Sequence, residues 1–190
     1  MNIKKFSIYS SIITAVIVIA CIVCCFIVIP TPFTFENEPK SITVYNYNKS
    51  SKGETVTKNG AYSNYYNTLV KEFQKTTTFT VFERIVSGAN IYKKASQDIK
   101  QTKPTWSSVK RGVTIEISFQ EKESIVVFVD GDSKLIEYYG LAMVVQPSSN
   151  VHEVSLYFNT KQDGSYTSSP ILIQMKTEKL YKLITTMEFN

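Results

Sequence analysis

Residues 113–145 read VTIEISFQEKESIVVFVDGDSKLIEYYGLAMVV, and this stretch decides the fold class. Residues 113–119 alternate apolar with polar side chains, which is typical of a strand that is buried on one face. The continuous apolar run at 125–129 indicates a more deeply buried strand, and the Asp130-Gly131 pair that follows is a common hairpin turn. Further strands are predicted over residues 135–139, 141–145, 151–158 and 171–175.

Helical periodicity appears on both sides of this β-rich part. Residues 61–75 place large apolar side chains on one face, with Ser63 near the start of the predicted helix. Before it, residues 42–47 alternate as a strand, and residues 54–57 are expected to pair back onto them. Thr177 is the predicted N-cap of a closing helix. The apolar face of that closing helix is formed by Leu180, Leu183, Ile184 and Met187.

The order of these elements predicts an α+β fold. Short connections between consecutive strands favour a mainly antiparallel sheet, with two or three helices packed on one of its faces. Residues 78–87 fit a helix and a strand equally well, and residues 88–112 are polar and irregular. We expect one domain over residues 42–190, because the sequence contains no internal repeat and no second domain boundary.

An uncharged segment precedes this domain. No charged residue lies between Phe6 and Phe35, and residues 8–29 are almost entirely apolar. A helix of that length rises about 1.5 Å per residue and covers the roughly 30 Å hydrocarbon core of a bilayer. Lys4 and Lys5 precede the segment, and the first charges after it are acidic, so the positive-inside rule places the N-terminus in the cytoplasm.

The predicted organisation therefore has four parts. Residues 1–7 form a cytoplasmic N-terminus, and residues 8–29 form a transmembrane signal anchor that is longer than the apolar core of a cleaved signal peptide. Residues 30–41 form a tether, and residues 42–190 form an extracytoplasmic α+β domain. We expect the protein in the cell membrane, with a single span and its C-terminal domain outside the cell.

All three cysteines of the chain lie within the apolar segment, at Cys21, Cys24 and Cys25. Residues 18–21 (VIAC) resemble the lipobox of bacterial lipoproteins, so attachment through a lipidated Cys21 is an alternative to the anchor. An apolar stretch rather than a polar tether follows Cys21, which departs from that pattern. The cysteine-free remainder can form no disulfide, as is common in Gram-positive surface proteins.

A basic set within residues 88–112 is the candidate binding site. It is formed by Lys93, Lys94, Lys103, Trp106, Lys110 and Arg111. Such a set is suited to an anionic polymer of the cell envelope or to an acidic protein partner. We expect no nucleic acid as a partner, because all 16 acidic residues follow residue 30 and leave the external part only mildly positive.

The alternative catalytic site is the Asp130 and Asp132 pair. A hydrophobic strand that ends in D-x-D resembles the metal-binding motif of nucleotide-sugar glycosyltransferases, in which two carboxylates hold a divalent cation. The preceding residues lack the βαβ rhythm of such enzymes. With one histidine, His152, and no cysteine outside the apolar segment, neither a conventional triad nor a zinc site can be assembled, and no cofactor is indicated.

The layout of the whole chain resembles small membrane-anchored surface proteins of low-GC Gram-positive bacteria. The shared features are an early strand and helix, a β-rich half and the closing L-Y-x-L-I helix at residues 180–184. The resemblance transfers no functional residue. The sequence predicts a non-enzymatic domain that binds or senses a ligand at the cell envelope. Two alternatives remain, a D-x-D enzyme and an accessory subunit of a membrane complex.

Overall fold

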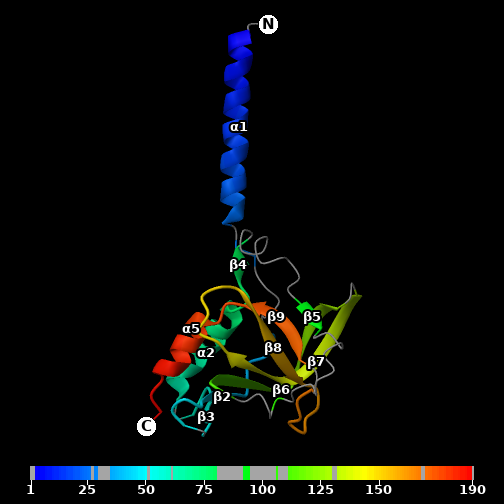
Figure 1. Cartoon of the computed structure of the whole chain (residues 1–190). Helices are drawn as coiled ribbons and strands as arrows, with labels where there is room; N and C mark the ends of the chain where they lie inside the picture. Colours follow the sequence, from blue (N-terminus) through cyan, green and yellow to red (C-terminus); the bar gives the residue numbers. More distant parts are fainter. Residues whose placement is uncertain are drawn as a thin grey trace. The chain divides into compact units, whose positions relative to one another are not determined.

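The structure of the chain is a computed structural model (Figure 1). It describes residues 3–26, 28–29, 35–50, 52–60, 62–80, 92–94, 106, 111–129, 132–167 and 170–189. The chain divides into two compact units, which are described separately. The first unit comprises Met1–Pro30 and Thr78–Ala89, and the second comprises Thr31–Thr77 and Asn90–Asn190.

In the first unit, helix α1 runs over Ile3–Cys25. The helix ends before residue 29, because Val28–Ile29 form strand β1 and pair antiparallel with β4, Phe79–Thr80. The membrane span over residues 8–29 stays a prediction. The large apolar side chains that are described on α1, and that of Phe26 just after it, are between 50% and 71% exposed. They include all four positions from Val16 to Ile19, so every side of that helical turn is exposed. Among the residues that the structure describes, no helix combines the length and the apolarity that crossing a membrane requires.

The second unit is built on an antiparallel sheet, which in the described residues has seven strands in the order β3-β2-β6-β7-β8-β9-β5. Each neighbouring pair is antiparallel. The α+β class and the antiparallel sheet predicted from the sequence are therefore confirmed. The strands are β2 (Ser41–Asn46), β3 (Glu54–Val56), β5 (Tyr92–Lys94), β6 (Val113–Val129), β7 (Asp132–Val145), β8 (His152–Asn159) and β9 (Ile171–Met175).

Strands β6 and β7 are longer than the sequence predicts. The separate strands expected at 113–119 and 125–129 form one strand, because the polar residues between them make a register shift between Ser118 and Glu123 instead of a turn. The predicted break in β7 is also absent, since Gly140 continues the ladder. A Cβ at Gly140 would lie 3.0 Å from the carbonyl oxygen of Ile117, so glycine permits this close approach.

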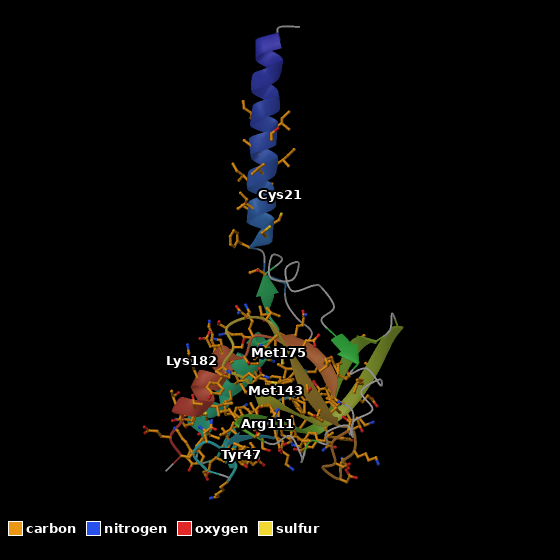
Figure 2. All side chains as sticks on the ribbon, in the orientation of Figure 1. Cys21, Tyr47, Arg111, Met143, Met175 and Lys182 are labelled. Atoms are coloured by element: carbon orange, nitrogen blue, oxygen red, sulfur yellow. The ribbon has the colours of Figure 1, made fainter. Side chains whose placement is uncertain are left out.

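The two helices of the second unit, α2 (Ser63–Lys75) and α5 (Glu178–Thr186), contact each other and cover one face of the sheet (Figure 1). Cross-strand pairs such as Ile42 with Ile117 and Met143 with Leu156 place apolar side chains on that face at every second residue. Figure 2 shows Met143 and Met175 among the side chains that fill this core. The predicted packing of helices on one face is confirmed.

The predicted helix starts need two corrections. Helix α2 begins at Ser63 rather than at the predicted residue 61, and α5 begins directly after Thr177. The Thr177 hydroxyl makes no capping hydrogen bond to α5, and donates instead to the carbonyl oxygen of Gln146 at 2.7 Å. Thr177 therefore ties the start of α5 to the residue that follows β7, rather than capping the helix with its side chain.

Residues 35–40, which the sequence predicts as part of a tether, belong to the second unit and pack against its core. The Phe35 ring lies 5.7 Å from the Phe73 ring and 5.0 Å from the Phe119 ring. The Glu123 carboxylate, which is 2% exposed at the residue level, accepts the backbone N–H groups of Glu36 at 3.1 Å and Asn37 at 2.6 Å. The chain therefore enters the domain as an ordered segment that is held by the β6 bulge.

We predict that Glu123→Ala destabilises the domain. The substitution leaves two part-buried N–H groups without their acceptor, which is expected to lower the free energy of unfolding by about 1–3 kcal/mol. Denaturant unfolding of the full chain in nonionic micelles measures the effect. Glu121→Ala, at an exposed position of the same bulge, is the matched control. Equal stability of the two variants would contradict the role assigned to Glu123.

Candidate functional site

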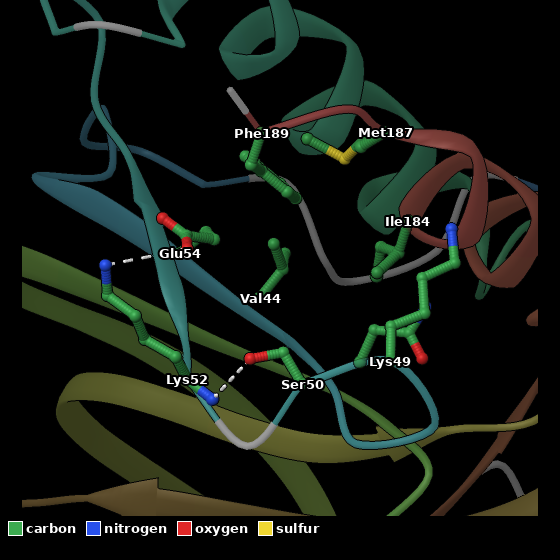
Figure 3. A pocket seen from close by; sticks show the side chains of 9 residues that line it. Val44, Lys49, Ser50, Lys52, Glu54, Ile184, Met187 and Phe189 are labelled. Atoms are coloured by element: carbon green, nitrogen blue, oxygen red, sulfur yellow. Dashed lines mark hydrogen bonds and ion pairs between the residues drawn. The ribbon is translucent and has the colours of Figure 1, made fainter.

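A cavity of about 200 Å³ lies between the β2–β3 hairpin and the C-terminal end of α5 (Figure 3). One wall is apolar, and the other carries the polar side chains of the hairpin. The lining residues are Val44, Asn46, Lys49, Ser50, Lys52, Glu54, Ile184, Met187 and Phe189. All of them belong to the second unit, so the cavity is formed within one compact body.

The hairpin is held in place by its pairing and by a local turn. Val44 pairs with Glu54 across the two strands and with Ile115 of β6 on its other side. The carbonyl oxygen of Asn46 accepts the N–H groups of Lys49 and Ser50, at 2.8 and 2.9 Å. This tight turn begins where β2 ends, and it brings Lys49 and Ser50 to the cavity, which Lys52 and Glu54 also line.

The apolar wall comes from the end of α5. Ile184 is the last buried residue of the helix, and Met187 then leaves the helix in an extended conformation. This change of direction returns the chain across the cavity, where the half-buried ring of Phe189 packs edge-on against Tyr62 with centroids 4.9 Å apart. Figure 3 shows Phe189 and Met187 on one side of Val44 and the loop residues Lys52 and Ser50 on the other.

The polar wall carries hydroxyl, ammonium and carboxylate groups of the hairpin. The Ser50 hydroxyl accepts the N–H group of Lys52 at 3.1 Å. Glu54, whose side chain is 28% exposed, has its carboxylate 3.9 Å from the Lys52 ammonium. The side-chain oxygen of Asn46 is buried and has no hydrogen-bond partner within the described structure. Such an unpaired atom costs about 1–3 kcal/mol of desolvation.

Lys49 connects the two walls. Its ammonium donates to the carbonyl oxygen of Thr185 at 2.8 Å. The last four carbonyl groups of a helix lack partners within the helix, and the C-terminal end of a helix carries partial negative charge. Lys49 thus satisfies one of these carbonyls and holds the hairpin loop to the end of α5.

The described members of the basic set predicted from the sequence do not line this cavity. Lys93 and Lys94 belong to strand β5, and Arg111 is exposed directly before β6. Lys103 and Lys110 lie outside the described residues. Binding of an anionic polymer or an acidic partner by this set stays a prediction.

Trp106 is a packing residue. Its side chain is 4% exposed at the residue level and lies with Tyr157 and Ala142 in a small cluster separate from the main core. The indole N–H donates to the Glu116 carboxylate at 2.8 Å. Burial of the Tyr157 side chain raises its pKa. The Tyr166 ring also packs against Trp106, and its own burial, together with the negative charge of Glu116, raises the pKa of Tyr166. An indole face covered in this way is not presented to a ligand.

The alternative catalytic pair is only partly described. Asp130 lies outside the described residues, and the backbone of Asp132 pairs with Val129 at the end of the β6–β7 ladder. Within the described ranges, no group of three or more His, Cys, Asp or Glu side chains is placed to hold a metal ion. Cys21 and Cys24 are exposed on α1, as the labelled position of Cys21 in Figure 2 illustrates. Lipidation of Cys21 stays a prediction.

Sequence reasoning missed the cavity. The residues that line it come from two segments, 44–54 and 184–189, whose proximity depends on how α5 crosses the sheet. The one residue in the sequence that could have indicated the cavity is Asn46, a polar residue at the end of an alternating strand. Polar residues are common at strand ends, so Asn46 does not distinguish a cavity from an ordinary turn.

We predict that Lys49→Met loosens the end of α5. Loss of the contact to Thr185 should lower the free energy of unfolding by about 0.5–1 kcal/mol, because one terminal carbonyl loses its donor and the helix end loses a nearby cation. Hydrogen exchange of the Met187 amide, which bonds to Leu183, should accelerate. Lys71→Met, on the exposed side of α2, is the control. Unchanged exchange in both variants would refute the connection.

Comparison of the chain with known protein families, with curated proteins and with solved structures finds no match in any of the three. The functional argument therefore rests on the chemistry of the cavity and on the exposed apolar surface of α1.

Proposed function

We propose that the chain is a membrane-anchored binding protein whose α+β domain takes a small amphipathic molecule into the cavity between the β2–β3 hairpin and α5. The observation that carries the proposal is the cavity itself, in which the apolar side chains of Val44, Ile184, Met187 and Phe189 face the polar side chains of the hairpin. A ligand that covers the apolar wall and forms hydrogen bonds with the polar side chains satisfies both surfaces at once.

The size of the cavity limits the ligand. About 200 Å³ is below the usual range of drug-sized sites, roughly 300–1,000 Å³. It is somewhat larger than the roughly 150 Å³ apolar cavity that accommodates a benzene molecule. The proposed ligand is therefore a molecule with one ring or one short branched chain and one or two polar groups.

The position of the cavity suits a sensing role. Its walls come from the hairpin at one edge of the sheet and from the last turn of the C-terminal helix. An occupant would contact both elements and add to the Lys49 hydrogen bond between them. A ligand that binds the folded state in this way stabilises it and holds the C-terminal residues in place.

The anchor is the second part of the proposal. Its support is the uncharged sequence from Phe6 to Phe35 and the exposure of the described apolar side chains of α1. The apolar run at residues 8–29 extends beyond Ile12–Phe26, the part of this segment whose side chains are described. Lipid is the proposed occupant of this surface, with Lys4 and Lys5 on the cytoplasmic side and the α+β domain outside the cell.

We predict that 2-phenylethanol, a neutral probe with one ring and one hydroxyl, binds in the cavity. Methyl NMR of the full chain in nonionic micelles should show saturable shifts of the Ile184 and Met187 methyl groups, because both line the cavity. The methyl groups of Ile173, a fully buried residue of β9 outside the cavity lining, should stay unchanged.

The matched variant fills the mouth of the cavity. Ser50 is exposed there, so Ser50→Trp should abolish the shifts while the protein stays folded. Ser149→Trp, at an exposed position outside the cavity lining, should leave them intact. Absence of saturable shifts in the unmodified chain, or their survival in Ser50→Trp, would reject the binding function.

We predict that Ile17→Lys releases the protein from membranes. A lysine near the centre of a span disfavours insertion by about 2.5–3.5 kcal/mol, whereas Ile17→Leu preserves apolarity. Fractionation after alkaline extraction measures the change.

Mass spectrometry of the N-terminus distinguishes the transmembrane anchor from lipid attachment at Cys21. An intact N-terminus supports the anchor, and a diacylglyceryl Cys21 supports the lipoprotein alternative. Release of the unsubstituted chain from membranes by alkaline extraction would refute both the anchor and the lipoprotein alternative.

A further inference from the structure

We infer that the ligand of this cavity is a small apolar monocarboxylate, whose carboxylate lies at the hairpin loop and whose apolar part covers the end of α5. The inference rests on the proposed binding function and adds the charge and the orientation of the ligand to it. The charge of the lining, the hydrogen-bond donors of the loop and their position opposite the apolar wall carry it.

The charged groups of the lining favour an anion. Lys49 and Lys52 contribute two ammonium groups and Glu54 contributes one carboxylate, so the described lining residues have one positive charge in excess. A cleft with an excess of one sign of charge attracts a ligand of the opposite sign. A ligand carboxylate therefore complements the lining, whereas a ligand cation would add to its excess charge.

The hairpin loop offers hydrogen-bond donors to a ligand. The Lys49 ammonium has three N–H groups, and its bond to the Thr185 carbonyl oxygen uses one of them. The Ser50 hydroxyl accepts the N–H group of Lys52 at 3.1 Å, and its own O–H remains to donate. Both side chains are exposed and line the cavity. A carboxylate, which only accepts hydrogen bonds, matches these donors.

Lys52 is held only loosely by Glu54. The 3.9 Å between the Lys52 ammonium and the Glu54 carboxylate is too long for a hydrogen bond, and the Lys52 side chain is 81% exposed. An ion pair of this kind contributes little to stability, so Lys52 can turn towards a ligand carboxylate at low cost. All three of its N–H groups are then available to the ligand.

The end of α5 would by itself disfavour an anion. The C-terminal end of a helix carries partial negative charge, and the last turn of α5 has no basic residue of its own. Lys49 offsets this field, because its ammonium is bonded to the Thr185 carbonyl at that end. It supplies a full positive charge where the helix supplies roughly half a negative one, so the balance at this side of the cavity stays positive.

The polar and apolar groups lie on opposite sides of the cavity. Figure 3 shows Lys49, Ser50 and Lys52 along the hairpin loop, with Met187 and Phe189 on the far side of Val44. A ligand whose apolar part covers Met187 and Phe189 therefore has its carboxylate at the loop. A volume of about 200 Å³ admits one ring or one short branched chain beside that group.

Three probes with the same carbon skeleton test the charge of the ligand. Phenylacetate carries a carboxylate, 2-phenylethanol a hydroxyl and 2-phenylethylamine an ammonium. Titrations of the full chain in nonionic maltoside micelles at neutral pH are followed by the Ile184 and Met187 methyl groups. We expect phenylacetate to bind about tenfold more tightly than 2-phenylethylamine. A change from about 0.1 M to about 1 M salt should remove most of this difference, because salt screens charges at an exposed site.

Charge-neutralising variants test the residues. Lys52→Gln should weaken phenylacetate about fivefold and leave 2-phenylethanol within about twofold. Glu54→Gln should strengthen phenylacetate binding, because it removes the carboxylate of the lining. Lys161→Gln, at an exposed position outside the cavity lining, should change no affinity. Lys49 is left unchanged, because it also holds the end of α5.

The outcomes separate the two proposals. Phenylacetate that is weakened by Lys52→Gln and unaffected by Lys161→Gln supports the inference. Binding of 2-phenylethylamine at least as tight as that of phenylacetate overturns it, even when 2-phenylethanol binds in the cavity. Unchanged phenylacetate affinity in Lys52→Gln also overturns it. Failure of all three compounds to shift the Ile184 and Met187 methyl groups overturns the binding function itself.

Discussion

The antiparallel pairing of β6 with β7 is the interaction on which the second unit depends. The ladder runs from Val113 paired with Val145 to Val129 paired with Asp132. Both strands extend the sheet further, since β2 pairs with β6 and β8 pairs with β7. Because side chains alternate between faces along each strand, this one register decides which residues of all neighbouring strands face the helices. A slip by one residue would turn Ile115, Ile117 and their partners out of the core.

The register shift in β6 has a second consequence. It leaves the ladder irregular between Ser118 and Glu123, and Glu123 uses this break to hold the backbone of Glu36 and Asn37. Phe35 is fixed by the same part of the sheet through Phe119. A polar interruption that looks like a loop in the sequence thus becomes the place where the chain enters the domain.

The cavity arises because the helices cover the sheet incompletely near its β3 edge. The apolar face of α5 ends with Ile184 and Met187, and the polar end of the β2–β3 hairpin lies opposite. Lys49 closes one side through its hydrogen bond to the Thr185 carbonyl oxygen. The same closing helix therefore completes the core and forms one wall of the cavity. A molecule bound in the cavity would stabilise the C-terminal residues. These include Phe189, whose ring packs against that of Tyr62, the residue before α2.

The sequence was sufficient for the fold class and for most elements, because alternation and helical periodicity are local patterns. Strand β2, helix α2 and the apolar face of α5 were predicted with nearly their observed bounds. The joined strands were missed because a bulge and a turn both use polar residues, and only pairing across β7 distinguishes them. The side-chain cap expected of Thr177 was wrong because its hydroxyl has a better partner outside α5, at Gln146.

The candidate site could not be predicted in the same way. Trp106 was selected for its residue type, but burial against Tyr157 and a hydrogen bond to Glu116 make it part of the packing. Asn46 and Glu54 are ordinary residues of a short hairpin until α5 is placed beside them. The sequence by itself determined the α+β class, the apolar N-terminal segment and the faces of the helices, since these follow from neighbours along the chain. Only the tertiary structure decided the cavity, because it arises where segments 44–54 and 184–189 meet in space.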